Sequence, residues 1–193
     1  MDKKPVILRK ADKLFARYGY QKTTMDEIAS ACRMAKSSLY YYFQNKDEIF
    51  AEVIMQDSII FRQKLNEAVE SVLQPNEKIL AYVYARLKHL LDLTNYYTTL
   101  TDEYMDHYTF IEKTRNDFYQ YEKDKLKELL QLGIDQGKFD VVDPDLTARM
   151  ISIIIKGLEY PLLISKSDIN LEIEIPQLLN ILFEGLNNKW SKI

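Results

Sequence analysis

The residues best suited to chemistry form a short run of amino, hydroxyl and phenol groups near residue 40. On a helix that advances about 100° per residue, Leu39 and Phe43 fall on one face and the polar groups on the others. The polar groups are Lys36, Ser37, Ser38, Tyr40, Tyr41 and Tyr42. Lysine can donate to guanine, serine can bond either kind of base, and a phenol can donate to phosphate. The run predicts a surface that contacts the DNA major groove. The plainer alternative is that the tyrosines pack in the core, but Tyr40, Tyr41 and Tyr42 cannot all face the core, because they span about 200° of the helix.

Two further residues could face phosphates beside this run. Thr24 and Glu27 have the spacing of a capping box, which opens a helix whose end could meet an anion. Lys46 falls in the first turn of a later helix, where its charge opposes the helix dipole unless an anion is bound there. We add Thr24 and Lys46 to the candidate contacts, with an indifferent surface lysine as the alternative for Lys46.

Two short helices separated by a three-residue break position these groups. The helix that begins after Thr24 turns Ile28 and Ala29 inward, a break follows at residues 33–35, and the helix with the polar face comes next. Residues 24–43 therefore match a helix-turn-helix. An amphipathic helix precedes them and ends at Gly19. Its apolar face comprises Ile7, Leu8, Ala11, Leu14, Phe15 and Tyr18.

The composition of the 193-residue chain is that of a folded protein, with 47% hydrophobic and 28% charged residues. Its single cysteine excludes an internal disulfide and, with two histidines, is too little for a zinc site, so we expect no cofactor. The absence of a signal-peptide pattern and of a run of about 20 apolar residues favours a cytoplasmic protein without a membrane partner. Residues 1–46 carry ten Lys or Arg and four acidic residues, a formal charge of +6, and the remainder carries −9. A basic head on an acidic body favours a polyanion as the partner of the head.

The rest of the chain has helical periodicity too, so we expect an all-α fold of about nine helices. Local signals mark the helix boundaries. They are the capping pair Asn45 and Glu48, Pro75-Asn76, Gly137, and Asp143-Pro144. The segment 169–175 alternates apolar and polar residues as a strand does. Because a strand would have no partner here, we interpret this segment as a connection into the last helix.

The run TTMDEIASACRMAKSSLYYYFQNKDEIF, residues 23–50, resembles the DNA-binding signature of the TetR family of transcriptional regulators. Gly19-Tyr20 and residues 137–151 also fit this family. The resemblance implies a helix-turn-helix DNA-binding domain at 1–48 and a larger helical ligand-binding and dimerisation domain at 49–193. It implies base contacts from Lys36 and Ser37. It implies mainly phosphate contacts from Thr24, Ser38, Tyr40, Tyr41, Tyr42 and Lys46.

Four positions depart from the family pattern. Arg33 stands where the family usually has the turn glycine, so an arginine must adopt that backbone without the freedom of glycine. Ala35 stands where a serine is frequent and cannot cap the next helix. Ser37 replaces a common glycine and Tyr42 a common histidine. The fold is compatible with these changes, but the operator sequence does not follow from the motif.

Tyrosines concentrate in the body of the chain, where eight of the fourteen lie between Tyr82 and Tyr121. A buried phenol needs a hydrogen-bond partner, so this density indicates an amphipathic pocket, with ordinary core packing as the alternative. The candidate lining residues are Tyr82, Tyr97, Tyr104, His107, Tyr108, Phe118 and Tyr121. Asp102, Glu103 and Asp106 are close in sequence, which leaves the ligand open between a lipophilic cation and a neutral aromatic or acyl compound.

The helix that begins at Pro144 is apolar nearly all round, and the last helix is also rich in apolar residues. Such helices suit the four-helix interface of a homodimer, with an ordinary central core as the alternative. The candidate interface residues are Met150, Ile154, Leu158, Leu179, Leu182, Phe183 and Leu186.

These observations favour a homodimeric repressor that binds a pseudo-palindromic operator in double-stranded DNA and is released by a small amphipathic effector. One alternative is a DNA-bound architectural or protein-interaction factor without an effector. Another is an all-helical enzyme with His107 as proton carrier. No positioned nucleophile, metal cluster or phosphate loop in the sequence supports the enzyme, so we predict no catalytic residues.

Overall fold

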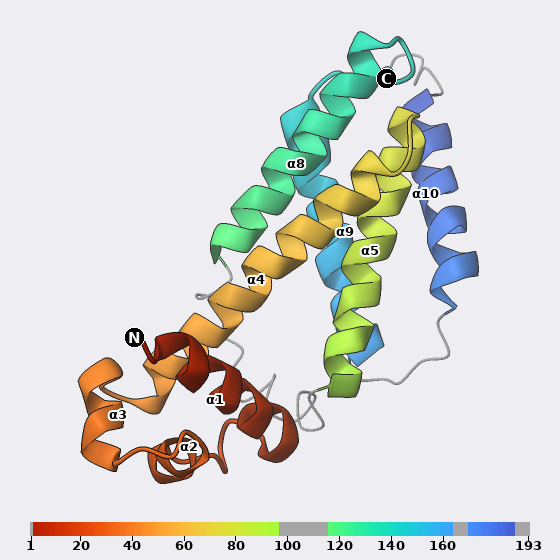
Figure 1. Cartoon of the computed structure of the whole chain (residues 1–193). Helices are drawn as coiled ribbons and strands as arrows, with labels where there is room; N and C mark the ends of the chain where they lie inside the picture. Colours follow the sequence, from red (N-terminus) through yellow and green to blue (C-terminus); the bar gives the residue numbers. More distant parts are fainter. Residues whose placement is uncertain (1, 97–115, 164–169, 188–193) are drawn as a thin grey trace. The chain divides into compact units, whose positions relative to one another are not determined.

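The computed structural model describes residues 2–96, 116–163 and 170–187, and all regular structure in these ranges is helical (Figure 1). This confirms the all-α class predicted from the periodicity. The helices are α1 (Lys4–Tyr18), α2 (Met25–Ala31), α3 (Lys36–Tyr42), α4 (Lys46–Glu70), α5 (Pro75–Tyr96), α8 (Asn116–Asp135), α9 (Pro144–Leu163) and α10 (Leu171–Asn187). None of these helices is long and apolar enough to cross a membrane.

Helices α1, α2 and α3 share one small apolar core with the first turns of α4. Helix α2 packs against both α1 and α3. The core side chains are Ile7, Leu8, Ala11, Phe15, Ile28, Ala29, Leu39, Phe43, Ile49 and Val53. Helix α1 ends at Gly19, whose φ of 83° lies in the left-handed region that glycine enters without strain. Tyr18, which we predicted on the apolar face, is 45% exposed because it is the last residue of the helix and extends beyond this core.

The chain divides into two compact units, and one division falls within α4: the first unit contains the residues up to Ile60 and those from Asp92 at the end of α5, and the second unit begins at Phe61. The second unit continues with α5 as far as Leu91 and includes α8, α9 and α10. The domain boundary that we predict from the sequence, between residues 48 and 49, falls in the first turn of α4. Ile49 and Val53 of α4 belong to the first core, so the first unit extends into this helix.

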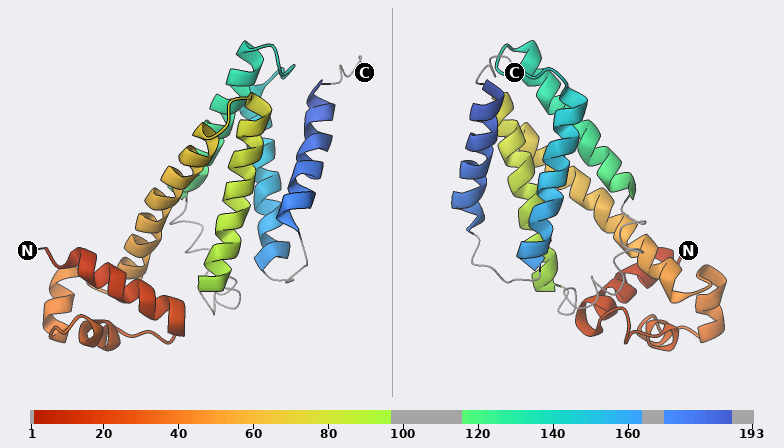
Figure 2. Two further views of the ribbon diagram at one scale, coloured as in Figure 1. Left: turned by 45° about the vertical axis from the view of Figure 1, so that its right-hand side comes forward. Right: turned by 180° about the vertical axis from the view of Figure 1, so that it is seen from behind.

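Within the second unit, α5, α9 and α10 run alongside one another (Figure 2). Helix α8 ends as predicted, since Gly137 has a φ of 66°. The amide of Lys138 donates to the carbonyl of Gly133 at 2.8 Å and that of Gly137 to Ile134 at 2.9 Å, which is a Schellman motif. The predicted start at Asp143 is also present, because its Oδ1 accepts from the amide of Leu146 at 2.9 Å.

The interpretation of residues 169–175 as a connection is wrong from Leu171 onward, where α10 begins. Asn170 caps the helix by accepting from the amide of Glu172 at 3.1 Å, and its own amide donates to Glu174 at 3.1 Å. Leu171, Ile175 and Leu179 are buried at a spacing of four, whereas Ile173 is 56% exposed. The alternation was misleading because Ile173, which lies between buried Leu171 and Ile175 in the sequence, is on the exposed face of the helix.

Candidate nucleic-acid interface and ligand-binding cluster

Helix α3 presents the polar face that the sequence predicts. Leu39 and Phe43 are fully buried in the first core, which fixes the rotation of the helix about its axis. Ser37, Ser38 and Tyr40 are exposed, and Tyr41 is 84% exposed. Tyr42 is partly buried against the core, and its ring meets that of Tyr41 edge-on at 5.3 Å. Together with exposed Lys36, five of the six predicted contacts on α3 are therefore accessible without any change of fold, and Tyr42 mainly supports Tyr41.

Arg33 forms the turn that separates α2 from α3. It has a φ of 54° and is the only non-glycine residue with a positive φ in the described ranges. Its amide donates to Ser30 and the amide of Met34 to Ala29, both at 3.0 Å, so the turn is closed by backbone hydrogen bonds. The left-handed backbone that glycine would supply is thus present with an arginine, at a cost of about 1–2 kcal/mol. Ala35 precedes α3 without a side-chain cap, as its methyl group requires.

Lys36, the first residue of α3, is ion-paired with a residue that the sequence reasoning did not select. Its Nζ lies 2.8 Å from Oδ1 of Asp26, on the first turn of α2. The hydrogen bond to Asp26 raises the pKa of Lys36, so the amine stays charged. Opposite charges on the two sides of the helix-turn-helix turn were the available signal for this pair.

Thr24 and Lys46 each have partners within the first unit. Thr24 forms the predicted capping box: its Oγ1 accepts from the amide of Glu27 at 3.3 Å and its amide donates to Glu27 at 2.8 Å. Lys46 donates to the carbonyl oxygens of Tyr20 at 2.6 Å and Gln21 at 3.2 Å. Its amine also lies 4.2 Å from the ring centroid of Tyr20. Lys46 therefore ties the loop after α1 to the start of α4.

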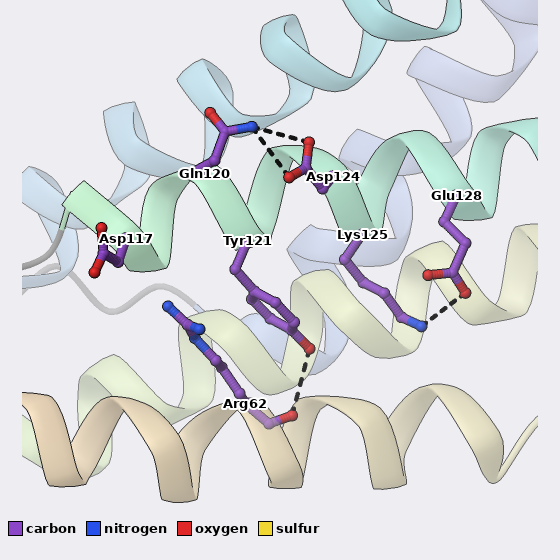
Figure 3. A pocket seen from close by; sticks show the side chains of 7 residues that line it. All are labelled: Arg62, Asp117, Gln120, Tyr121, Asp124, Lys125 and Glu128. Atoms are coloured by element: carbon purple, nitrogen blue, oxygen red, sulfur yellow. Dashed lines mark hydrogen bonds and ion pairs between the residues drawn. The ribbon is translucent and has the colours of Figure 1, made fainter.

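Of the predicted pocket residues, the structure describes Tyr82, Phe118 and Tyr121, all in the second unit. The others, Tyr97, Tyr104, His107 and Tyr108, lie outside the described residues. The acidic residues Asp102, Glu103 and Asp106 also lie outside them. Tyr82 and Phe118 are buried. Tyr121 is partly buried and lines a groove of about 490 Å³ between α4 and α8 (Figure 3). Its hydroxyl donates to Asn66 at 2.9 Å, and the guanidinium of Arg62 lies 4.8 Å from its ring centroid.

A buried charge cluster, which the sequence reasoning missed, joins three helices next to these residues. Arg86 of α5 is 1% exposed and donates through Nε to Glu122 of α8 at 2.9 Å, and through Nη2 to Glu159 of α9. Ser152 of α9 donates to the other oxygen of Glu122 at 2.6 Å. Burial acts to lower the pKa of Arg86, but the carboxylates of Glu159 and Glu122 outweigh it and raise the pKa. The rings of Phe118 and Phe61 lie 5.2 and 5.8 Å from the guanidinium carbon.

The predicted dimer residues fall into three groups. Met150 is 49% exposed, and Ile154 and Leu158 are partly buried. Leu179 is 3% exposed and belongs to the core of a single chain. The side chains of Leu182, Phe183 and Leu186 lie outside the described residues. Helix α9 is not buried on every side, since Leu146, Met150 and Ile153 are 43–55% exposed at helical spacing.

The first unit contains a helix-turn-helix whose second helix, α3, is accessible. Comparison with known proteins identifies the class of protein more closely. The profile of "Bacterial regulatory proteins, tetR family" matches residues 7–53. The HTH-type transcriptional regulator YhgD of Bacillus subtilis (strain 168), itself uncharacterised, is 31% identical over 152 residues, which cover 77% of this chain and 78% of YhgD. The chain belongs to the TetR family and is a transcriptional regulator of that type.

Solved structures give the same fold. A transcriptional regulator from Cytophaga hutchinsonii ATCC 33406 superposes with a TM-score of 0.78 at 26% identity, over 97% of this chain and all 100% of that one. AibR, in a complex with isovaleryl coenzyme A and operator DNA, superposes with a TM-score of 0.60 at 22% identity, over 94% and 98% of the two chains.

Proposed function

We propose that this regulator is a repressor that binds double-stranded operator DNA through α3 and leaves it when a small amphipathic ligand binds the second unit. The observation that carries the proposal is the exposure pattern of α3. Leu39 and Phe43 anchor the helix in the core, while Ser37, Ser38 and Tyr41 face outward. A helix held rigidly by one face can place the side chains of the other face against base edges.

The contacts differ in what they read. Lys36 and Ser37, at the start of α3, are proposed to meet bases, since the N-terminal residues of a recognition helix reach deepest into the groove. Ser38, Tyr40 and Tyr41 are proposed to meet phosphates, which sets position and affinity but not sequence. The remaining predicted phosphate contacts are proposed to lie near the DNA backbone and to act chiefly by supporting the loops and helix ends that carry the other contacts. They are Thr24, Tyr42 and Lys46.

A homodimer would present two copies of α3 to a pseudo-palindromic operator, at one DNA turn of about 34–36 Å or a multiple of it. The exposed apolar stripe of α9 supports this proposal, because Leu146, Met150 and Ile153 remain uncovered in a single chain. Exposed Ile181 of α10 replaces buried Leu179 as the proposed contribution of that helix. Ligand binding would favour a dimer whose recognition helices no longer match the half-site spacing.

The test is a titration of the purified full chain against a duplex from its own promoter region and a scrambled duplex, followed by fluorescence anisotropy at several salt concentrations. Lys36→Ala should weaken binding to the promoter duplex about tenfold and reduce the preference over the scrambled duplex. Tyr41→Phe should weaken binding to both duplexes alike. Lys138→Ala removes the same charge from an exposed site in the second unit and serves as the control. Equal affinities of the Lys36 variant and the control would contradict the site.

A further inference from the structure

The second unit contains hydrogen-bond donors that lack acceptors. Within the described part of the chain, the buried side-chain nitrogen and oxygen atoms without a partner are Arg62 Nε, Tyr82 Oη and Arg86 Nη1. Two of them are guanidinium nitrogens, which can only donate, and the third is a phenol. We call Arg62, Tyr82 and Arg86 the donor cluster.

Two members of the donor cluster, Tyr82 and Arg86, lie close together. Tyr82 and Arg86 are one turn apart on the same face of α5 and are fully buried. Burial raises the pKa of Tyr82, and the negative charge of Glu122 raises it further. The positive charges of Arg86 and Arg62 act in the opposite direction. Tyr82 therefore keeps its proton at neutral pH.

The unpaired groups of the donor cluster favour a hydrogen-bond acceptor over a cation as the ligand. Arg86 already neutralises part of the charge of Glu122 and Glu159 through its other two nitrogens. The buried groups without partners are N–H and O–H donors, and an oxygen atom with free lone pairs could accept hydrogen bonds from them.

We propose that the donor cluster holds the acyl oxygen of the effector, either a carboxylate or a carbonyl, and this inference rests on the proposed function. Tyr82 and Arg86 donate to that oxygen. Phe61 and Phe118 lie beside Arg86 and are 3% exposed, so they offer apolar surface to the hydrocarbon part of the same ligand. The site thus selects acyl compounds among the ligand classes that the aromatic composition left open.

The unmatched donors make one substitution diagnostic. In the free protein a buried hydroxyl without a partner opposes folding, and in the complex the same hydroxyl contributes to binding. Tyr82→Phe removes only this oxygen and keeps the ring. It should therefore stabilise the free protein and weaken the complex, whereas loss of a tyrosine hydroxyl with an internal partner would destabilise the free protein. Tyr84→Phe is the matched control, because its hydroxyl lies on the same helix but donates to exposed Glu172 at 3.4 Å.

The experiment measures calorimetric affinities of the full chain for octanoate, octanamide and octylammonium, which share one hydrocarbon chain. We expect octanoate or octanamide to bind, with octylammonium at least tenfold weaker, and a comparison of the first two distinguishes a carboxylate site from a carbonyl site. Tyr82→Phe should weaken the preferred acyl ligand about tenfold and raise the melting temperature of the free protein by about 2 °C or more. Tyr84→Phe should change neither value appreciably.

Three results would overturn the inference: preference for octylammonium, no binding of either acyl compound, or an affinity of Tyr82→Phe equal to that of the parent. A lower melting temperature of the free Tyr82→Phe variant would also count against it, because the hydroxyl would then have an internal partner. Operator binding without ligand is measured on the same preparations. If the protein binds its operator but fails the ligand tests, only this inference is contradicted. If the protein does not bind DNA, the proposed function is contradicted.

Discussion

Asp26 and Lys36 form an ion pair across the turn of the helix-turn-helix, with 2.8 Å between Oδ1 and Nζ. Both side chains are more than half exposed, so the pair adds little stability. It nevertheless holds Lys36 of the proposed recognition helix against a carboxylate that the proposed DNA contact would have to displace. In the free protein the pair lowers the effective positive charge at the start of α3.

Asp26→Asn should therefore increase affinity for DNA of any sequence, because Lys36 is released and a carboxylate that repels phosphate is removed. We expect scrambled duplex to bind about two- to fivefold more tightly, with a steeper dependence on salt. Anisotropy titrations at three salt concentrations measure both quantities. Asp140→Asn makes the same charge change at an exposed position of the second unit, so equal gains in the two variants would show that net charge alone is responsible.

The left-handed backbone at Arg33 leads to a prediction about stability. Arg33→Gly should stabilise the first unit by up to about 1 kcal/mol, because relief of the strain exceeds the added entropy of the unfolded glycine. Arg9→Gly is the contrasting control, since Arg9 is exposed in the middle of α1 and the same change there should destabilise by about 1 kcal/mol. Chemical denaturation of both variants measures the difference. A loss of stability in Arg33→Gly would mean that the arginine side chain has a stabilising contact larger than the strain.

Local signals predicted most of the helix ends, because the chemistry of a cap lies within four residues of sequence. Thr24 with Glu27, Gly137, and Asp143 each act on backbone groups next to them, and each end is confirmed. Asn45 also caps α4 through the amide of Glu48, although the Glu48 carboxylate accepts from Gln44 rather than from Asn45.

The buried cluster around Arg86 could not be predicted in the same way. Its partners Glu122 and Glu159 are 36 and 73 residues away, so no local pattern connects them. The available hint was an arginine on the apolar face of α5, four residues from both Tyr82 and Leu90. Because a buried arginine requires acidic partners, that position could have prompted a search for glutamates on neighbouring helices.

The close approach of Phe139 to Gly133 leads to a packing prediction. A Cβ at Gly133 would lie 2.0 Å from Cδ2 of the Phe139 ring, so Gly133→Ala should force the ring out of its site and destabilise by about 1–3 kcal/mol. Gly157→Ala is the matched control inside α9, where an added Cβ meets no atom within 4 Å and should stabilise by up to about 1 kcal/mol. Thermal unfolding of the two variants measures whether the first is less stable, and the second more stable, than the parent chain. Similar effects in both would show that helix propensity, and not the ring contact, determines the outcome at Gly133.

The exposed apolar stripe on α9 leads to a prediction about assembly. Ile153 is 55% exposed in a single chain, so Ile153→Asp should leave the fold intact but place a charge in the proposed dimer interface. Analytical ultracentrifugation should find a dimer for the parent chain and a monomer, or a dimer at least a hundredfold weaker, for the variant. Val142→Asp, at a fully exposed residue before α9, should leave the dimer unchanged. The Ile153 variant should also lose affinity for the complete operator while keeping the weaker affinity for an isolated half-site, because only the dimer joins two recognition helices. A variant that stays dimeric with unchanged affinity would show that the subunits meet elsewhere.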